Sequence, residues 1–200
     1  MSTAPVFRPA TDDDAPALAA RIREVSPEVV DSLLQGLLPG ISVENILTMV
    51  LRDASSHFSH KNCVLAELDG AMAGLLFAYP AEHQGIPVLM ERMVSARRLL
   101  PVRELLTLCA PGSLYINTLW VDASVRGQGM ADALMDYARF WAGQMGRAAL
   151  SLFAWRDNTR AVAFYRRQGF SPVREITAQG PLAERHSKGD LYILPLGNTP

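Results

Sequence analysis

The amino-acid sequence predicts a mixed α/β domain of the α+β class, in which a β-hairpin precedes a strand–helix–strand–helix half. Two apolar runs, 63–68 and 71–79, flank Asp69-Gly70, a dipeptide typical of tight hairpin turns. Two more apolar runs, 114–121 and 148–155, are each followed by apolar residues at helical spacing. With 49% hydrophobic and 20% charged residues, the chain can build a packed core.

The N-terminal region is expected to form one short strand and then helices. The strand covers 6–10, and a helix follows from 11 to about 23, with carboxylates in its first turn where the helix dipole favours them. Valine and leucine residues at helical spacing predict a second helix over 27–38, which Pro39-Gly40 ends. A third helix is expected over 43–53.

The segment at about 86–110 is expected to be a helical insertion beside the main sheet. It has helical character, is interrupted by Pro101 and carries several arginines. We interpret it either as a lid with a role in substrate binding or as a solvated connection. A chain of 200 residues then forms a single domain over 1–196, followed by a loose tail at 197–200.

The C-terminal half is expected to contain two strand–helix pairs and a last strand. The strands cover the two apolar runs named above, and the helices that follow them cover 129–145 and 158–168. The last strand is expected over 190–194. One face of the first of these helices is expected to be apolar: Met130, Leu134, Tyr137, Trp141 and Met145.

Charge, hydropathy and cysteine usage exclude several classes of function. The formal net charge of −1 predicts no global attraction to nucleic acid or to anionic membranes. The apolar stretches are shorter than the roughly 20 residues of a membrane helix, and the N-terminal residues lack a signal-peptide pattern. Cys63 and Cys109 have neither disulfide nor zinc spacing, and His57 and His60 lack a third ligand. We therefore expect a cytoplasmic protein without a metal.

The hexapeptide 126–131 is the clearest candidate for an anion-binding site. Gly127 and Gly129 let the backbone bend between a strand and a helix so that several N–H groups converge. The helix that begins there adds unpaired N–H groups and the positive end of its dipole, which favours a pyrophosphate. A tight turn without a ligand would have the same sequence. A Walker A loop needs Gly-Lys-Ser/Thr, and a dinucleotide loop needs a small residue in place of Asp132.

Two motifs in this half resemble those of the GNAT superfamily of N-acetyltransferases. Residues 121–131 read VDASVRGQGMA and are similar to the acyl-CoA motif Arg/Gln-x-x-Gly-x-Gly/Ala. Residues 158–170 read NTRAVAFYRRQGF and are similar to the Asn…Phe-Tyr-x-x-x-Gly-Phe helix of that family. The resemblance implies a mostly antiparallel central sheet flanked by helices, and acetyl-CoA as the co-substrate.

The resemblance also implies where the cofactor binds. The strand ending at Val121 would separate from the strand beginning near Ala148, and the pantetheine arm would lie in the gap. Backbone N–H groups of 127–132 would hold the pyrophosphate. Arg126 would add a charge or brace the loop, and Asn158 would bind the arm, cap its helix, or do both. The implied cofactor-binding residues are Leu119, Trp120, Val121, Arg126, Gly127, Gln128, Gly129, Met130, Ala131, Asp132 and Asn158.

Tyr165 is the catalytic residue that the resemblance implies, as the general acid that protonates the leaving thiolate. The alternative is an ordinary core aromatic beside Phe164. The general base remains unassigned, because Phe153 stands where some family members carry a glutamate. Tyr115 or Asn117 could instead order a water that relays the proton. Further candidates, by residue type and region alone, are Glu67, Glu82, His83 and Glu91.

Together these features predict an acetyl-CoA-dependent N-acetyltransferase that acts by direct attack of a primary amine of a small molecule. Trp120 and Trp155 near the cleft suggest a small or partly apolar amine, while polyamines, aminoglycosides, amino acids and protein amines stay open as acceptors. A homodimer is possible, since strand edges in this fold often pair. One alternative is a non-catalytic acyl-CoA-binding or interaction module on the same fold. Another is a nucleotide-dependent enzyme, which the missing Walker lysine disfavours.

Overall fold

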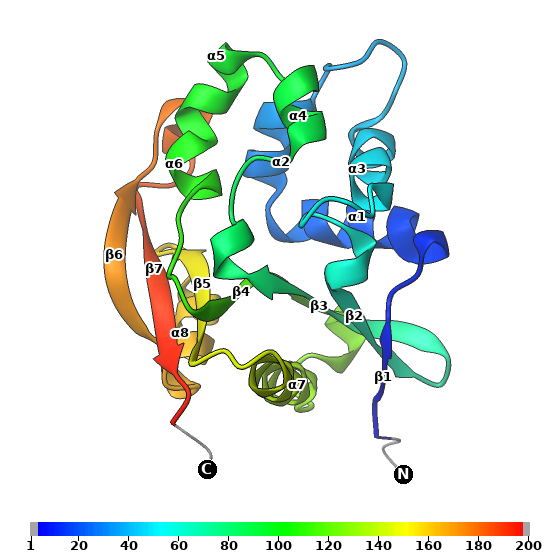
Figure 1. The fold of residues 1–200 in the computed structure, drawn as a ribbon, viewed down its shortest axis with the longest axis vertical. Helices are drawn as coiled ribbons and strands as arrows, with labels where there is room; N and C mark the ends of the chain where they lie inside the picture. The colour runs from blue at the N-terminus through cyan, green and yellow to red at the C-terminus, as the bar shows by residue number, and fades with distance from the viewer. Residues whose placement is uncertain (1–3, 198–200) are drawn as a thin grey trace.

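One seven-stranded sheet forms the centre of the computed structural model, which describes residues 4–197 (Figure 1). The strands are β1 (Val6–Pro9), β2 (Cys63–Leu68), β3 (Ala71–Pro80), β4 (Ser113–Val121), β5 (Ala149–Trp155), β6 (Ser171–Thr177) and β7 (Lys188–Pro195). Their order is β1-β2-β3-β4-β5-β7-β6, and among these neighbours β4 and β5 run parallel while the other pairs run antiparallel. The predicted mixed fold with a mostly antiparallel sheet is confirmed.

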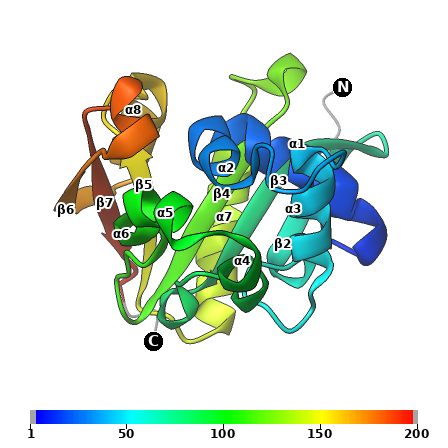
Figure 2. The same cartoon turned by 90° about the horizontal axis from the view of Figure 1, so that it is seen from above.

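Helices cover both faces of this sheet (Figures 1 and 2). They are α1 (Ala15–Val25), α2 (Pro27–Leu34), α3 (Val43–Arg52), α4 (Val88–Met93), α5 (Ala96–Leu99), α6 (Arg103–Leu106), α7 (Met130–Gln144) and α8 (Thr159–Arg167). The first three helices pack on one face and build the larger hydrophobic core. On the other face α7 packs over β3, β4 and β5, and α8 contacts β5.

The hairpin matches its prediction closely, because its signal is local. β2 has the predicted bounds, and β3 extends one residue further than expected. Asp69 and Gly70 have positive φ angles of 50° and 78°, as a two-residue turn with the twist of the sheet requires. Residues 63–66 and 73–79 of the two strands are buried, and most of their side chains belong to the cores on both faces of the sheet.

Two helix predictions need correction. α2 ends at Leu34 rather than at 38, because Gly36 adopts a left-handed φ of 64° and turns the chain before Pro39-Gly40 is reached. On α7 the buried residues are Met130, Leu134, Met135, Ala138 and Ala142. Two alanines at the contact let the helix lie close to the sheet. The bulkier Tyr137 is therefore at the flank, where its ring stacks on Phe7 at 4.9 Å, and Met145 is exposed.

β6 has no counterpart among the predicted elements. It is an edge strand whose side chains are exposed except for Ile176, so the burial pattern that reveals a strand is missing. It also contains Pro172 beside a bulge, which an edge strand tolerates. The neighbouring β7 is longer than the predicted strand at 190–194. Of the tail predicted at 197–200, all but Gly197 lies outside the described residues, and Gly197 is in neither helix nor strand.

The segment between β3 and β4 is broken into the short helices α4, α5 and α6. It is packed rather than solvated, since Leu99, Val102 and Leu105 join the larger core. Arg98 donates from its guanidinium to the carbonyl oxygens of Leu33 and Gln35 at 3.1 and 2.8 Å. These contacts hold the segment against the end of α2, beside the site described next.

Candidate active site

The site lies where β4 and β5 separate. Their pairing begins at Ser113 with Ala149 and ends at Ile116 with Leu152, although β4 continues to Val121. On its other side β4 stays paired with β3, but Phe77 pairs with Thr118 and Ala78 with Ile116, so Asn117 is the extra residue of a bulge. The register agrees with the separation that the family resemblance implied, and it leaves the end of β4 without a neighbour on the β5 side.

Two openings meet at this gap. The charged cleft, about 710 Å³, is walled by Glu24 and Val25, by the end of β4, by the loop 126–132 and by α8. The apolar cavity, about 170 Å³, lies on the other side, between α1, α2, the bulged part of β4, the end of β5 and the 86–110 segment. Both are lined by the same five residues: Val25, Leu119, Asn158, Ala161 and Tyr165. A group bound in one opening can therefore reach a group bound in the other.

Most residues predicted for the cofactor line the charged cleft. They are Leu119, Trp120, Val121, Arg126, Gly127, Gly129, Ala131, Asp132 and Asn158. Two predicted residues, Gln128 and Met130, turn their side chains elsewhere. Gln128 donates to the carbonyl oxygen of Ser124 at 3.0 Å, and Met130 is buried in the core under α7.

The loop of the charged cleft has the backbone geometry that an anion site needs. Gly127 and Gly129 have φ angles of 79° and 87°, and no atom lies within 4 Å of where a side chain would begin. Glycine is thus required here by backbone conformation, and the space in front of the loop stays open. Gly129 is also the N-cap of α7, and the first N–H groups of a helix have no partner within the helix.

Arg126 braces this loop. Its Nε donates to the carbonyl oxygen of Val121 at 3.0 Å, and its guanidinium lies 3.6 Å from Glu24 of α1. The Asp132 carboxylate is likewise engaged, since it accepts a hydrogen bond from Gln168 at 2.6 Å. Both side chains are thus held by partners within the protein.

Two arginines in the charged cleft were missed at the sequence level. Arg160 and Arg167 are exposed and line the cleft from α8. They are seven residues apart, which places them on one face of a helix. That spacing was visible in the sequence, but which face of α8 turns to the cleft depends on tertiary packing.

Asn158 caps α8 and also lines both openings. Its Oδ1 accepts a hydrogen bond from the backbone N–H of Ala161 at 3.3 Å, so the predicted capping role is confirmed. Trp120 is buried, and the guanidinium of Arg21 lies 4.5 Å above its ring. Trp155 lines the apolar cavity and stacks on His186 at 4.6 Å.

Tyr165 is both a packed aromatic residue and a residue that lines the gap, as its two predicted roles require. Its ring packs edge-on against Phe164 at 5.5 Å and Phe170 at 5.8 Å, as a core aromatic would. It also lines both openings at the gap. Burial raises the pKa of Tyr165 to about 12, so its hydroxyl stays protonated at neutral pH.

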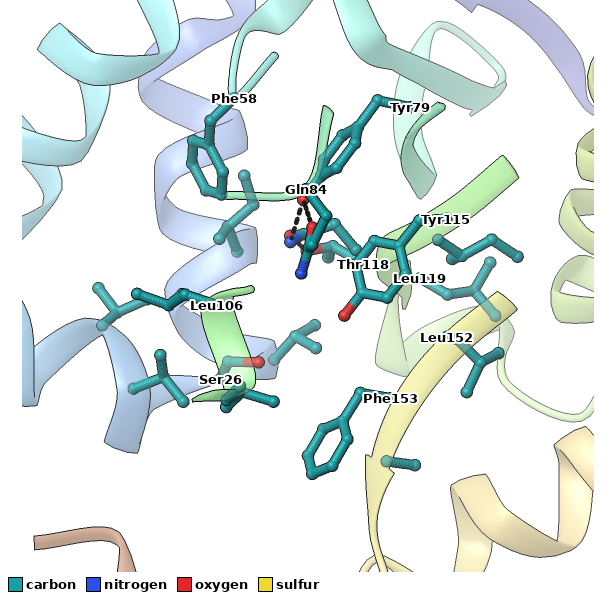
Figure 3. Close-up of a pocket in the computed structure, with 18 of the residues that line it drawn as sticks. Ser26, Phe58, Tyr79, Gln84, Leu106, Tyr115, Thr118, Leu119, Leu152 and Phe153 are labelled. Atoms are coloured by element: carbon teal, nitrogen blue, oxygen red, sulfur yellow. Dashed lines mark hydrogen bonds between the residues drawn. The ribbon is translucent and has the colours of Figure 1, made fainter. Parts of the chain in front are cut away.

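A group of uncharged polar side chains lies at the bulge (Figure 3). Asn117 donates to the hydroxyl of Tyr79 at 3.2 Å, and that hydroxyl donates to Gln84 at 2.6 Å. Tyr115 points its hydroxyl into the cavity, and burial raises the pKa of both tyrosines. Tyr79 and Gln84 were missed at the sequence level, because nothing local links them to a site on β4.

Three glutamates and one histidine were considered as the general base by residue type and region. In the described part of the chain, none of these four residues lines either opening. Glu67 pairs with Arg8 at 2.8 Å on β1. Glu82 accepts from the backbone N–H of Gly112 at 2.8 Å, and this bond, together with nearby Arg147, holds the pKa of Glu82 below its usual range. His83 and Glu91 also lie outside the lining.

Within residues 4–197, no three His, Cys, Asp or Glu side chains gather as a metal site would need. In the same range, no helix is long and apolar enough to cross a membrane.

Solved structures with the same fold are acetyltransferases. An N-acetyltransferase from Staphylococcus aureus Mu50 aligns with a TM-score of 0.68 at 19% identity, covering 94% of this chain and 100% of that chain. An agmatine N-acetyltransferase aligns with a TM-score of 0.68 at 16% identity, covering 97% and 100%. The ribosomal-protein-S18-alanine N-acetyltransferase from Escherichia coli aligns with a TM-score of 0.58 at 14% identity, covering 98% of each chain.

These structures share the fold with the chain, and the family is shown by a match of the sequence to a family model. Residues 38–170 match the model of the acetyltransferase (GNAT) family, which is more than half of the chain. The chain belongs to this family, as its two motifs indicated. No curated protein matches the chain.

Proposed function

We propose that the chain transfers an acetyl group from acetyl-CoA to the primary amine of a small molecule at the gap between β4 and β5. The observation that carries this proposal is the meeting of a charged cleft and an apolar cavity at Tyr165. A two-substrate transfer needs such a junction, because the reacting atoms must be held within about 3–3.5 Å of each other. Residues 1–196 then act as one catalytic domain, in which the 86–110 insertion supplies one wall of the cavity.

The charged cleft is the side proposed for acetyl-CoA. The loop N–H groups from Gly127 to Asp132 would hold the pyrophosphate at the start of α7. Arg160 and Arg167 would contact further phosphate, where a guanidinium can form two parallel hydrogen bonds. The unpaired end of β4, Leu119 to Val121, would bind the pantetheine arm through its backbone.

Tyr165 is the proposed general acid. The amine nitrogen attacks the thioester carbonyl carbon from the apolar cavity, a C–N bond forms, and the C–S bond breaks. The phenol donates its proton to the departing sulfur, and the nitrogen loses a proton that restores the phenol, directly or through a water. Because burial keeps Tyr165 neutral, the proton is present throughout the ordinary pH range.

The test combines binding and turnover. Calorimetric titration should give micromolar affinity for acetyl-CoA and CoA, and no saturable binding of ATP or NAD. Thiol release from acetyl-CoA should then depend on an added primary amine. Binding of CoA without turnover of any amine would favour the non-catalytic module, and a lack of CoA binding would refute the proposal.

A further inference from the structure

The apolar cavity has an uncharged lining. Among the described residues that line it, there is no Asp, Glu, Lys, Arg or His. Its titratable side chains are Tyr79, Tyr115 and Tyr165, and burial raises the pKa of each, so all three are neutral at pH 7. The cavity therefore offers hydrogen bonds but no opposite charge to a bound ion.

The charged cleft differs in this respect. It contains the carboxylates of Glu24 and Asp132 and the guanidinium groups of Arg126, Arg160 and Arg167. Ionised groups are thus confined to the side proposed for the phosphates. The apolar cavity, from which the acceptor amine is proposed to attack, is thus the opening without ionised groups in its described lining.

An acceptor with a second charge would be poorly accommodated in the cavity. Moving an ammonium, guanidinium or carboxylate group out of water without a partner costs several kcal/mol in practice. The reacting amine avoids this cost, because it must be neutral to attack and apolar surroundings favour its neutral form. A distant second amine or an α-carboxylate adds a further cost, because it must either be buried with its charge unpaired or be neutralised against its own pKa.

The size of the cavity limits the rest of the acceptor. A dry apolar protein cavity of about 150 Å³ takes up benzene, and this cavity has about 170 Å³. Its walls carry Val29, Leu33, Phe58, Met90, Leu106 and Phe153. Figure 3 shows the Tyr115 hydroxyl directed into the space near Ser26, Leu106 and Phe153. Tyr115 and Tyr165 both line this cavity, so it has hydroxyl groups as well as apolar walls.

From these observations, and given the proposed acetyl transfer, we propose that the acceptor is an apolar monoamine. It carries one primary amine on a short linker and one apolar group about the size of a single aromatic ring. Diamines, guanidino amines and amino acids are excluded by their second charge. The cavity thus differs from what agmatine, a guanidino amine, would require, although an agmatine N-acetyltransferase shares the fold.

The experiment compares amines of similar length on the full chain. Phenethylamine and benzylamine represent the proposed class, and agmatine, 1,4-diaminobutane and phenylalanine carry a second charge. The kcat/KM for thiol release should be about 100-fold higher for the first group, the size of an unpaired-charge penalty. Calorimetric binding of the same amines to the CoA-loaded protein should rank them in the same order, and this readout does not require turnover.

A pair of variants tests the cause. Leu106 is half-buried on α6 and lines the cavity, so a polar side chain can reach both solvent and the acceptor. Leu106→Glu should shift the preference at least about tenfold toward 1,4-diaminobutane, because it supplies the missing carboxylate. Leu106→Gln has the same shape without the charge and should leave the ratio between the two amines near its original value.

The outcomes separate this inference from the proposed function. Turnover with agmatine or diaminobutane equal to or above phenethylamine would overturn the inference and leave acetyl transfer intact. Absence of acetyl-CoA binding would refute the proposed function, and titration of the same amines into the CoA-free protein would still decide whether the cavity prefers apolar monoamines. Equal shifts in Leu106→Glu and Leu106→Gln would contradict the role assigned to charge.

Discussion

Replacing Tyr165 by phenylalanine removes one hydroxyl from the junction of the two openings and leaves the rest of the side chain in place. The ring keeps its contacts with Phe164 and Phe170, at 5.5 and 5.8 Å. The free energy of unfolding should therefore fall by no more than about 1 kcal/mol, the typical worth of one hydrogen bond. A general acid contributes about 100-fold or more to the rate, which corresponds to about 2.7 kcal/mol in the activation free energy.

The assay is steady-state thiol release at saturating acetyl-CoA, together with calorimetric affinity for acetyl-CoA and a thermal melt. We expect kcat to fall by about 100-fold or more while the Kd stays within about twofold, since the phenol acts on the sulfur only as the C–S bond breaks. Tyr137→Phe is the matched control, because Tyr137 is half-buried on α7 and lines neither opening. A Tyr165→Phe variant with unchanged kcat would remove the acid role, and a parallel loss of affinity would make Tyr165 a binding residue instead.

Three further predictions concern the loop, the pH profile and the end of β5. Gly129→Glu should abolish detectable CoA binding in calorimetry. The backbone φ of 87° at this position is strained for any residue with a side chain, and the new carboxylate would repel a phosphate. Unchanged affinity would show that the phosphates bind elsewhere. The kcat/KM should rise tenfold per pH unit below the pKa of the free amine and then stay level to pH 10. The level part is expected because the pKa of Tyr165 is raised to about 12, so its hydroxyl does not ionise in this range. A fall in kcat/KM between pH 8 and 10 would contradict the assignment of Tyr165 as the acid. Gly189→Ala should lower the free energy of unfolding by about 1–3 kcal/mol in urea melts and weaken amine binding. The new methyl group would overlap the rings of Phe153 and Trp155 at the end of β5. An unchanged free energy of unfolding would show that both rings can move aside.

Several features of the protein could be predicted from the sequence because their signals are local. Asp69-Gly70 defines the hairpin turn through positive φ angles, and Asn158 caps α8 through its own side chain. Gly127 and Gly129 mark the loop because the left-handed conformation they adopt is costly for other residues. Each of these depends on a few consecutive residues, so a single pass along the chain finds it.

Other features depended on tertiary contacts. β6 was missed because an exposed edge strand has no alternating burial. On α7 the predicted Met130 and Leu134 are buried and Tyr137 and Trp141 pack against the same core, but the buried contact also includes Met135, Ala138 and Ala142, and Met145 is exposed. Asn117 occupies a bulge that only the pairing of β4 with β3 reveals. Tyr79 contacts Asn117 across 38 positions of the sequence and links it to Gln84, a distance over which no local signal extends.

The sequence by itself determined the family, the anion loop and the candidate acid, since motif spacing and turn conformation are properties of short segments. Only the tertiary structure decided the character of the acceptor side. The lining of the apolar cavity comes mainly from α1, α2, β4, β5, α8 and the 86–110 segment. The helices α1, α2 and α8 and the 86–110 segment also carry charged residues, which lie outside this lining. Which faces meet is settled by how the elements pack around the gap, and this packing leaves the charges on one side of Tyr165 and the apolar surface on the other.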